Sequence, residues 1–308
     1  MVQHPEAPVL LVTFNRPDYS KQVLEQIRKA RVSKLYVFND GPREGNATDA
    51  EARTAIQQLL KEIDWPCSLQ TFFPEKNMGC AAGVSSAIGW IFSHEDRAII
   101  LEDDTVPTQG FFQYCGEMLD RYLHDTRVWM VSGNNYNEEY QLPSSYTFSR
   151  SAIHIWGWAT WRRCWQHYDI SLEAWPLFAH AGGFNNLFGS RAVIDFWTKR
   201  YQQLYAEKDT VTRRTWDYQY VLSLLTNGGL CIVPAKNLVT NIGHTGTHTA
   251  GVHSSHNLPV DENFKVTSHP GFIVPNAGYD SHHVKHFWNR KKAFTTRINN
   301  KIRKLISR

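Results

Sequence analysis

The chain has 308 residues, of which 42% are hydrophobic and 20% charged, with a formal net charge of +4. This composition supplies a large apolar core and excludes a wholly disordered protein. Nine Lys or Arg residues and no acidic residue lie in 285–308, so the basic charge is confined to one end of the chain. Nucleic-acid binding is therefore not expected, because it requires basic residues spread over a face.

The five cysteines are odd in number and widely spaced, which indicates reduced thiols and neither a disulfide framework nor a zinc site. The first residues show no basic segment followed by a long apolar run. We therefore expect a cytoplasmic protein.

Residues 8–132 alternate short β-branched runs with helical patterns, which is typical of βα units on a mainly parallel sheet. The expected strands are 9–14, 35–38, 67–73, 98–101 and 129–132, and the expected helices are 19–30, 51–63, 80–93 and 111–123. The predicted fold class is α/β, with a Rossmann-like sheet covered by helices on both faces. We assign 8–132 as the nucleotide-binding half.

Residues 133–284 are less regular and rich in Gly, Asn, Pro and Trp. A helix is expected at 216–225 and a strand at 230–233, with irregular segments at 155–161 and 182–189. An irregular, aromatic-rich segment after a nucleotide-binding half suits acceptor binding, so we predict one catalytic domain over 1–284.

The remaining segment, 285–308, carries apolar residues at spacings of mainly three and four, together with its basic residues. This pattern predicts a basic amphipathic helix. Such a helix can bind an anionic membrane surface, which would make the protein peripheral on the inner face of the membrane. Alternatively, it packs on the domain with a solvated basic face.

Three consecutive acids, Glu102, Asp103 and Asp104, follow the apolar strand 98–101 directly. Their mutual repulsion at a sheet edge is relieved by a divalent cation, and carboxylate oxygens suit Mg²⁺ or Mn²⁺ bridging to a diphosphate. The structural alternative is an acidic helix cap.

Other polar residues follow the earlier strands. Asp40, after the second strand, can contact a nucleobase or ribose, or can simply be a turn residue. Arg16, after the first strand, can pair with a diphosphate, or can be a surface side chain. Asn77 and Gly79 precede a helix whose first turns are small, which permits close approach of a ligand.

Four further residues complete the candidate site. Asp217 lies near a helix start, where it can be a first-turn acid or a general base for an acceptor hydroxyl. His248 belongs to a cluster of loop histidines and is the one we select as a possible metal ligand. Trp156 and Trp158 are expected to be a mixture of core and acceptor wall.

The run from Glu102 to Pro107, followed by Gly110–Tyr114, resembles the corresponding region of the N-acetylglucosaminyltransferase I family. Further matches in the same order are Thr13–Arg16, Asn39–Gly41, Trp129–Gly133, Gly157–Trp158 and Trp216–Asp217. The resemblance covers about residues 8–250. The chain is also similar to bacterial glycosyltransferases of the broad family-2 type, many of which build surface polysaccharides.

The resemblance implies an inverting GT-A glycosyltransferase that uses a UDP-sugar and Mn²⁺. It implies that Asp104 binds the metal, that Glu102 and Asp103 contact ribose or bound water, and that Asp40 contacts uracil. Arg16 would lie on the diphosphate side.

By the same resemblance, Asp217 would be the base. The acceptor would be a glycan or a lipid-linked saccharide, but the N-glycan acceptor does not carry over. The alternatives are a sugar nucleotidyltransferase and an inactive homologue that binds saccharide.

Overall fold

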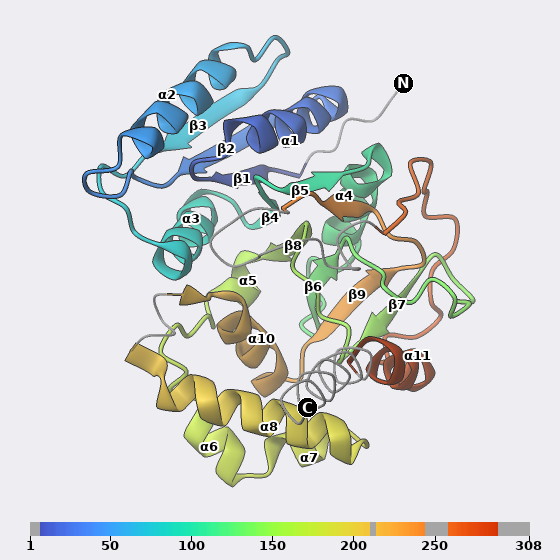
Figure 1. Ribbon diagram of the computed structural model, residues 1–308. Helices are drawn as coiled ribbons and strands as arrows, with labels where there is room; N and C mark the ends of the chain where they lie inside the picture. Colours follow the sequence, from blue (N-terminus) through green and yellow to red (C-terminus); the bar gives the residue numbers. More distant parts are fainter. Residues whose placement is uncertain (1–6, 210–213, 244–257, 289–308) are drawn as a thin grey trace, which may run out of the picture.

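The computed structural model describes residues 7–209, 214–243 and 258–288. Its centre is an eight-stranded sheet in the order β3-β2-β1-β4-β8-β6-β9-β7, beside a two-stranded sheet of β10 and β5 (Figure 1). The strands are β1 (Val9–Thr13), β2 (Lys34–Asn39), β3 (Ser68–Phe72), β4 (Arg97–Glu102), β5 (Thr105–Pro107), β6 (Val128–Ser132), β7 (Tyr146–Ser149), β8 (Trp158–Trp161), β9 (Leu230–Pro234) and β10 (Val239–Asn241).

The large sheet is mainly parallel, as the sequence predicts. β3, β2, β1 and β4 pair in parallel, and so do β6 and β9, whereas β8 and β7 run antiparallel to their neighbours. β8 lies between β4 and β6. The two predicted halves, 8–132 and 133–284, therefore contribute strands to the same sheet.

Helices cover both faces of this sheet. The main helices are α1 (Pro17–Ala30), α2 (Ala47–Lys61), α3 (Cys80–His94), α4 (Gln109–Arg121), α5 (Arg162–Trp165), α6 (Trp175–His180), α7 (Gly183–Leu187), α8 (Arg191–Ala206), α10 (Asp217–Thr226) and α11 (Ala277–His283). α1 packs against α2 and α4 on one face, whereas α3 packs against α5 on the other (Figure 1). This arrangement confirms the predicted α/β fold class.

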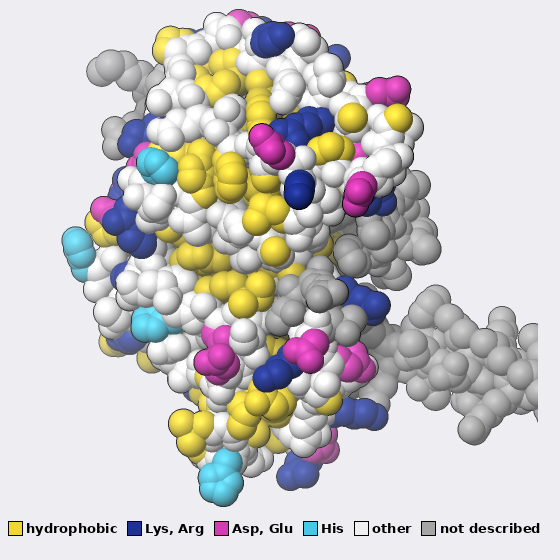
Figure 2. All heavy atoms as spheres, turned by 90° about the vertical axis from the view of Figure 1, so that its left-hand side faces the viewer, with side chains coloured by type: hydrophobic (Ala, Val, Ile, Leu, Met, Phe, Trp, Pro, Cys, Tyr) yellow, Lys and Arg dark blue, Asp and Glu magenta, His cyan; other side chains and the backbone are white. Residues whose placement is uncertain are grey.

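The burial of the strands explains why their sequences are almost entirely apolar. Every residue of β1, β6 and β9 is buried, as expected for strands covered on both faces. β3 lies at the edge of the sheet and keeps exposed positions. Figure 2 shows the side of the molecule that lies on the left in Figure 1, where apolar side chains gather across the surface with charged side chains scattered around them.

The expected elements of 8–132 all form, and their boundaries differ by a few residues from the expected ones. The prediction that 155–161 and 182–189 are irregular was wrong for most of their length. Residues 158–161 form strand β8, and residues 183–187 form helix α7. Helix α8 was also not expected. Aromatic side chains stabilise this part: the rings of Trp175 and Tyr201 lie 5.4 Å apart, and both residues are buried.

Only the beginning of the predicted amphipathic tail belongs to the part of the chain that the structure describes. Residues Val284–Trp288 form a π-helical turn, η1, directly after α11. The rest of the predicted tail helix, 289–308, lies outside the described residues. Within the described ranges, no helix combines the length and the apolar character needed to cross a membrane.

Candidate active site

The three acids lie at the carboxyl end of β4, where an open α/β sheet binds ligands. The hydroxyl of Thr105 accepts a hydrogen bond from the Glu102 amide and donates one to the Glu102 carbonyl, each 2.9 Å long. The chain then enters β5, which pairs with β10. The triplet is therefore fixed by secondary structure on both sides.

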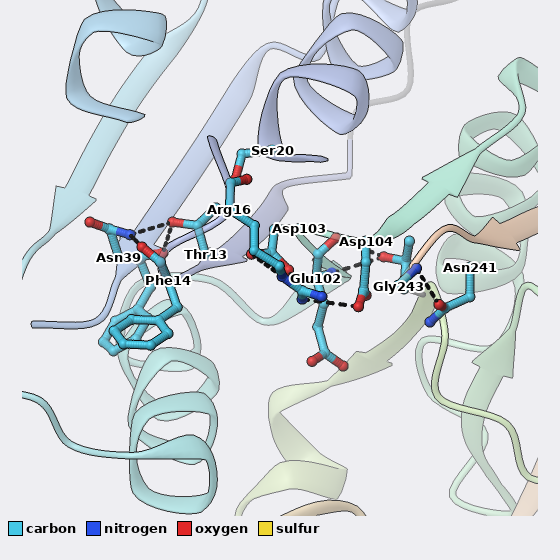
Figure 3. Close-up of polar contacts among 12 residues, drawn as sticks. Thr13, Phe14, Arg16, Ser20, Asn39, Glu102, Asp103, Asp104, Asn241 and Gly243 are labelled. Carbon is cyan, nitrogen blue, oxygen red and sulfur yellow. Dashed lines mark hydrogen bonds and ion pairs between the residues drawn. The ribbon is translucent and has the colours of Figure 1, made fainter. Parts of the chain in front are cut away.

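Arg16 reaches two of the three acids from the turn between β1 and α1. Its Nε lies 3.2 Å from Oδ2 of Asp103, and its Nη2 also contacts Oδ1 of the same carboxylate. Nη2 lies 2.9 Å from Oδ2 of Asp104. Figure 3 shows both Asp carboxylates at the guanidinium, whereas the Glu102 side chain extends away from it. The Arg16 side chain is 28% exposed, so it remains accessible to a ligand.

The electrostatics of this group favour a bound cation. Burial, followed by the charges of Asp104 and Asp103, raises the pKa of Glu102 to about 8. Burial also raises the pKa of Asp103 to about 6, although Arg16 opposes the shift. Asp217 contributes to the shift of Glu102 as well. Arg16 lowers the pKa of both Glu102 and Asp103 but leaves each above its usual value. A divalent cation would relieve the remaining repulsion.

The Asp104 carboxylate lies close against a glycine on the neighbouring segment. The Ile242 amide donates to the Asp104 carbonyl at 2.8 Å, which carries the chain past the triplet after β10. A Cβ on Gly243 would lie only 2.3 Å from Oδ2 of Asp104. Gly243 therefore lies beside Asp104. His248, five residues later in the sequence, lies outside the described residues.

Asp217 is brought to the triplet by a stack of tryptophans. Trp158 of β8 pairs with Ile100 of β4, two residues before Glu102. The ring of Trp158 stacks on that of Trp216 at 5.7 Å, and Asp217 is the next residue, the first of α10. The carboxylate of Asp217 accepts a hydrogen bond from the Thr215 hydroxyl and is partly exposed.

This stack changes the interpretation of the two predicted acceptor residues. Trp158 has no exposed surface, so in the expected mixture of core and acceptor wall it belongs to the core. Its position instead makes it a support for Trp216 and Asp217. Trp156 is partly exposed and makes an edge contact with Tyr136, so its predicted role in acceptor binding stays a prediction.

Asp40 fastens the loop that precedes α3. Its Oδ1 accepts hydrogen bonds from the amides of Gly41 and Met78, both at 2.8 Å. Its Oδ2 accepts from the Asn77 side chain and the Gly79 amide, both at 3.0 Å. Because four donors already surround this 8% exposed residue, a direct contact with a nucleobase would have to replace one of them. Its predicted contact with uracil stays a prediction.

Asn77 and Gly79 form the turn into α3. Gly79 has φ of +78°, a conformation that favours glycine, and it precedes the first helical residue. The turn therefore favours glycine at position 79, and the contact of Asn77 and Gly79 with a nucleotide sugar stays a prediction.

Cys80, the first residue of α3, is a site residue that the sequence interpretation missed. Burial raises the pKa of its thiol to about 12, and the charges of Glu102, Asp217 and Asp40 contribute to the shift. This thiol therefore lies within electrostatic reach of three predicted site residues. The sequence did offer one indication of this position. Cys80 is followed by Ala81, Ala82 and Gly83, and such small residues leave room for a ligand at the start of a helix.

Comparison with known proteins gives no family assignment. No family model and no curated protein match the chain. Among solved structures, UDP-glucose pyrophosphorylase in complex with UDP-glucose aligns over 52% of this chain and 78% of its own, with 7% identity and a TM-score of 0.32.

Two further solved structures give similar values. A 4-diphosphocytidyl-2C-methyl-D-erythritol synthase from Anaerococcus prevotii DSM 20548 covers 53% of this chain and 74% of its own, at 7% identity and a TM-score of 0.34. HddC from Yersinia pseudotuberculosis in complex with GMP-PN covers 52% and 80%, at 8% identity and a TM-score of 0.32. Likenesses this low assign no activity, so the function has to be inferred from the site.

Proposed function

We propose that this protein is a metal-dependent inverting glycosyltransferase that moves a sugar from a nucleotide sugar, UDP-linked, to a hydroxyl of a saccharide or lipid-linked glycan. The observation that carries the proposal is the group formed by Glu102, Asp103 and Asp104 at the end of β4, with Arg16 bonded to it. The charge of Asp217 acts on the same group. The UDP donor and a role in bacterial surface polysaccharide synthesis rest on the sequence resemblance.

The carboxylates of this group fit Mn²⁺ or Mg²⁺. Asp104 is the preferred ligand because it is partly exposed, whereas Asp103 is buried. Asp103 is less available, since Arg16 already holds both of its oxygens. A cation bound here would neutralise charge on the diphosphate as it leaves. Arg16 would add a fixed positive charge on the same side.

Asp217 fits the role of general base in an in-line displacement. One of its carboxylate oxygens would accept the proton of the acceptor hydroxyl, while the hydroxyl oxygen forms a bond to the anomeric carbon. The bond from that carbon to the diphosphate oxygen breaks, and the nucleoside diphosphate leaves with the electron pair. Its place beside Glu102, at the start of α10, supports this assignment.

The nucleoside would lie against the Asp40-anchored loop and the small residues that begin α3. Asp40 accepts hydrogen bonds from Asn77 and Gly79. The charges of Asp40 and of Glu102 both act on Cys80, the first residue of α3. The acceptor would then enter from the side of Trp156. Association with the inner face of a membrane through 285–308 remains part of the proposal.

Product analysis tests the reaction class. The purified full chain is incubated with Mn²⁺ and UDP-, GDP- or dTDP-sugars, with and without saccharide acceptors. Release of nucleoside diphosphate, together with inversion at the anomeric carbon, is expected for one donor class. Release of pyrophosphate from a nucleoside triphosphate and a sugar phosphate would instead establish a nucleotidyltransferase. Saccharide binding with no turnover of any donor would identify an inactive homologue.

A further inference from the structure

A second group of potential metal ligands lies far along the chain from the acidic triplet. Glu139, His282 and His286 each offer one ligand atom, and these atoms lie within 4.8 Å of one another. Glu139 belongs to the segment between β6 and β7, His282 to α11, and His286 to η1. The two histidines are four residues apart, so they lie on one side of the helix, with ring centroids 4.2 Å apart.

The segment that carries Glu139 is fastened to the helix that carries the histidines. The Tyr279 hydroxyl donates to Oδ1 of Asn135 at 2.9 Å, and Nδ2 of Asn137 lies 2.7 Å from Nδ1 of His283. A Cβ on Gly278 would lie 2.4 Å from the Tyr140 hydroxyl, which shows how closely the two segments approach. The three ligands are therefore presented by a fixed scaffold.

Neighbouring contacts also define which histidines are available. His283 is buried and bonded to Asn137, so it belongs to the scaffold. His282 is only half-buried, and its ring packs against Tyr140 at 5.4 Å. Its Nδ1 is buried with no hydrogen-bond partner within the described part of the chain. Buried polar atoms in that state call for a partner, and a bound cation is one that suits an imidazole.

We propose that Glu139, His282 and His286 bind a divalent cation of the zinc class, with water completing the coordination. Two imidazoles and one carboxylate suit Zn²⁺ and Co²⁺, whereas the all-carboxylate triplet suits Mg²⁺ or Mn²⁺. A tetrahedral zinc ion holds its ligand atoms about 3.3 Å apart. The three ligand atoms lie within 4.8 Å of one another, so side-chain rotation would have to bring them closer, and Glu139 is exposed and the two histidines are only half-buried.

The cation would fasten the end of α11 and the start of η1 to the segment between β6 and β7. Phe287, one residue after His286, stacks on Tyr136 of the same segment at 5.0 Å. Metal binding and aromatic packing would thus hold the same two parts of the chain together. This site is independent of the proposed transferase site, because it shares no residue with it.

Cobalt binding tests the proposal directly. The full chain, carrying no affinity tag and stripped with chelator, is titrated with CoCl₂ while the visible absorption of four-coordinate Co²⁺ is recorded. We expect saturation at one equivalent, displacement by ZnCl₂, and a higher melting temperature with metal bound. Glu139→Gln, at an exposed position, should lower Co²⁺ affinity by at least about tenfold.

Matched variants separate this site from others. His286→Ala should abolish the signal, whereas His124→Ala, at an exposed histidine far from the cluster in sequence, should leave it unchanged. Unfolding of each metal-free variant by circular dichroism controls for folding. Unchanged Co²⁺ affinity in both Glu139→Gln and His286→Ala would overturn the proposal. Loss of the signal in Asp104→Ala with retention in His286→Ala would also overturn it, by assigning the cobalt to the acidic triplet.

Discussion

The two groups of potential ligands are built in different ways. The acids at the end of β4 are consecutive in sequence and are held by the strand that precedes them. Glu139 and the two histidines come from segments more than 140 residues apart and meet only because the chain folds. A local motif is therefore visible in the sequence, whereas a site assembled by tertiary contacts is not.

The chemistry of the two groups differs as well. The group at the end of β4 offers only carboxylate ligands, beside one arginine. Such ligands suit a hard cation that binds and leaves together with a diphosphate. Imidazoles with one carboxylate suit a cation that stays bound. The predictions below test whether these two groups act separately, beginning with the largest expected effect.

Asp104→Ala should abolish transfer, with a loss of at least about a thousandfold, because electrostatic stabilisation of the leaving diphosphate would be removed. Calorimetry should show that Mn²⁺-dependent UDP binding is lost. Glu139→Gln is the matched control, since it removes one carboxylate from the other group and should leave transfer unchanged. Wild-type UDP affinity in Asp104→Ala with Mn²⁺ present would count against the metal assignment.

Asp217→Asn should reduce transfer by about a hundredfold to ten-thousandfold while UDP-sugar binding is retained, because the amide cannot accept the acceptor proton. Measuring donor affinity and kcat on the same preparation separates the two effects. Full transfer by this variant would remove Asp217 as the base.

Trp158→Ala should lower the free energy of unfolding by about 3–5 kcal/mol, because it leaves a cavity under Trp216. Trp156→Ala is the comparison, since Trp156 is partly exposed and should affect stability less. If Trp156 contacts the acceptor, its removal should raise the KM for acceptor with little change in melting temperature. Equal destabilisation by both substitutions would contradict the assignment of Trp158 alone to the core.

Glu102→Gln tests the electrostatics of the triplet through pH. With the pKa of Glu102 raised to about 8 in the folded state, the folded protein binds a proton that the unfolded chain releases at lower pH. Ionisation of Glu102 therefore costs stability as the pH rises from the unfolded value toward 8. In metal-free protein, the substitution should add on the order of 1–2 kcal/mol at pH 8 and nothing at pH 4.

Urea unfolding at both pH values, with chelator present, measures this difference. Added Mn²⁺ should reverse the order, because only the wild-type carboxylate gains a cation partner. If the difference in unfolding free energy between wild type and Glu102→Gln does not change with pH, then the pKa of Glu102 is not raised in the folded protein.

Most strands in the first half of the fold could be predicted because they are buried on both faces and contain continuous apolar runs. Val9–Val12 and Ala98–Leu101 are examples, and the acidic triplet begins directly after the second run. β8 was not predicted, since Trp158–Trp161 contains an antiparallel strand of only four residues beside a glycine. Its burial depends on α10 and α5, which no local pattern reveals.

Some residues of the candidate site could likewise be predicted from the sequence, and others could not. Arg16, Asp40 and the triplet each follow a strand, so their common edge could be anticipated from the order of elements. Cys80 and the support of Asp217 by Trp158 could not, because both depend on how α3 and α10 pack on the sheet. The hydrogen bonds that surround Asp40 also arise from a loop almost forty residues later.

The place of β8 between β4 and β6 has a consequence for synthesis on the ribosome. Until residues 158–161 emerge, β4 and β6 have no strand to join them, and the hydrogen-bonding edge of β4 stays open. An open edge of a parallel sheet is a template for association with other chains. Nascent chains that stall between residues 132 and 158 should therefore depend most on chaperones, and a fragment ending at residue 132 should aggregate where the full chain does not.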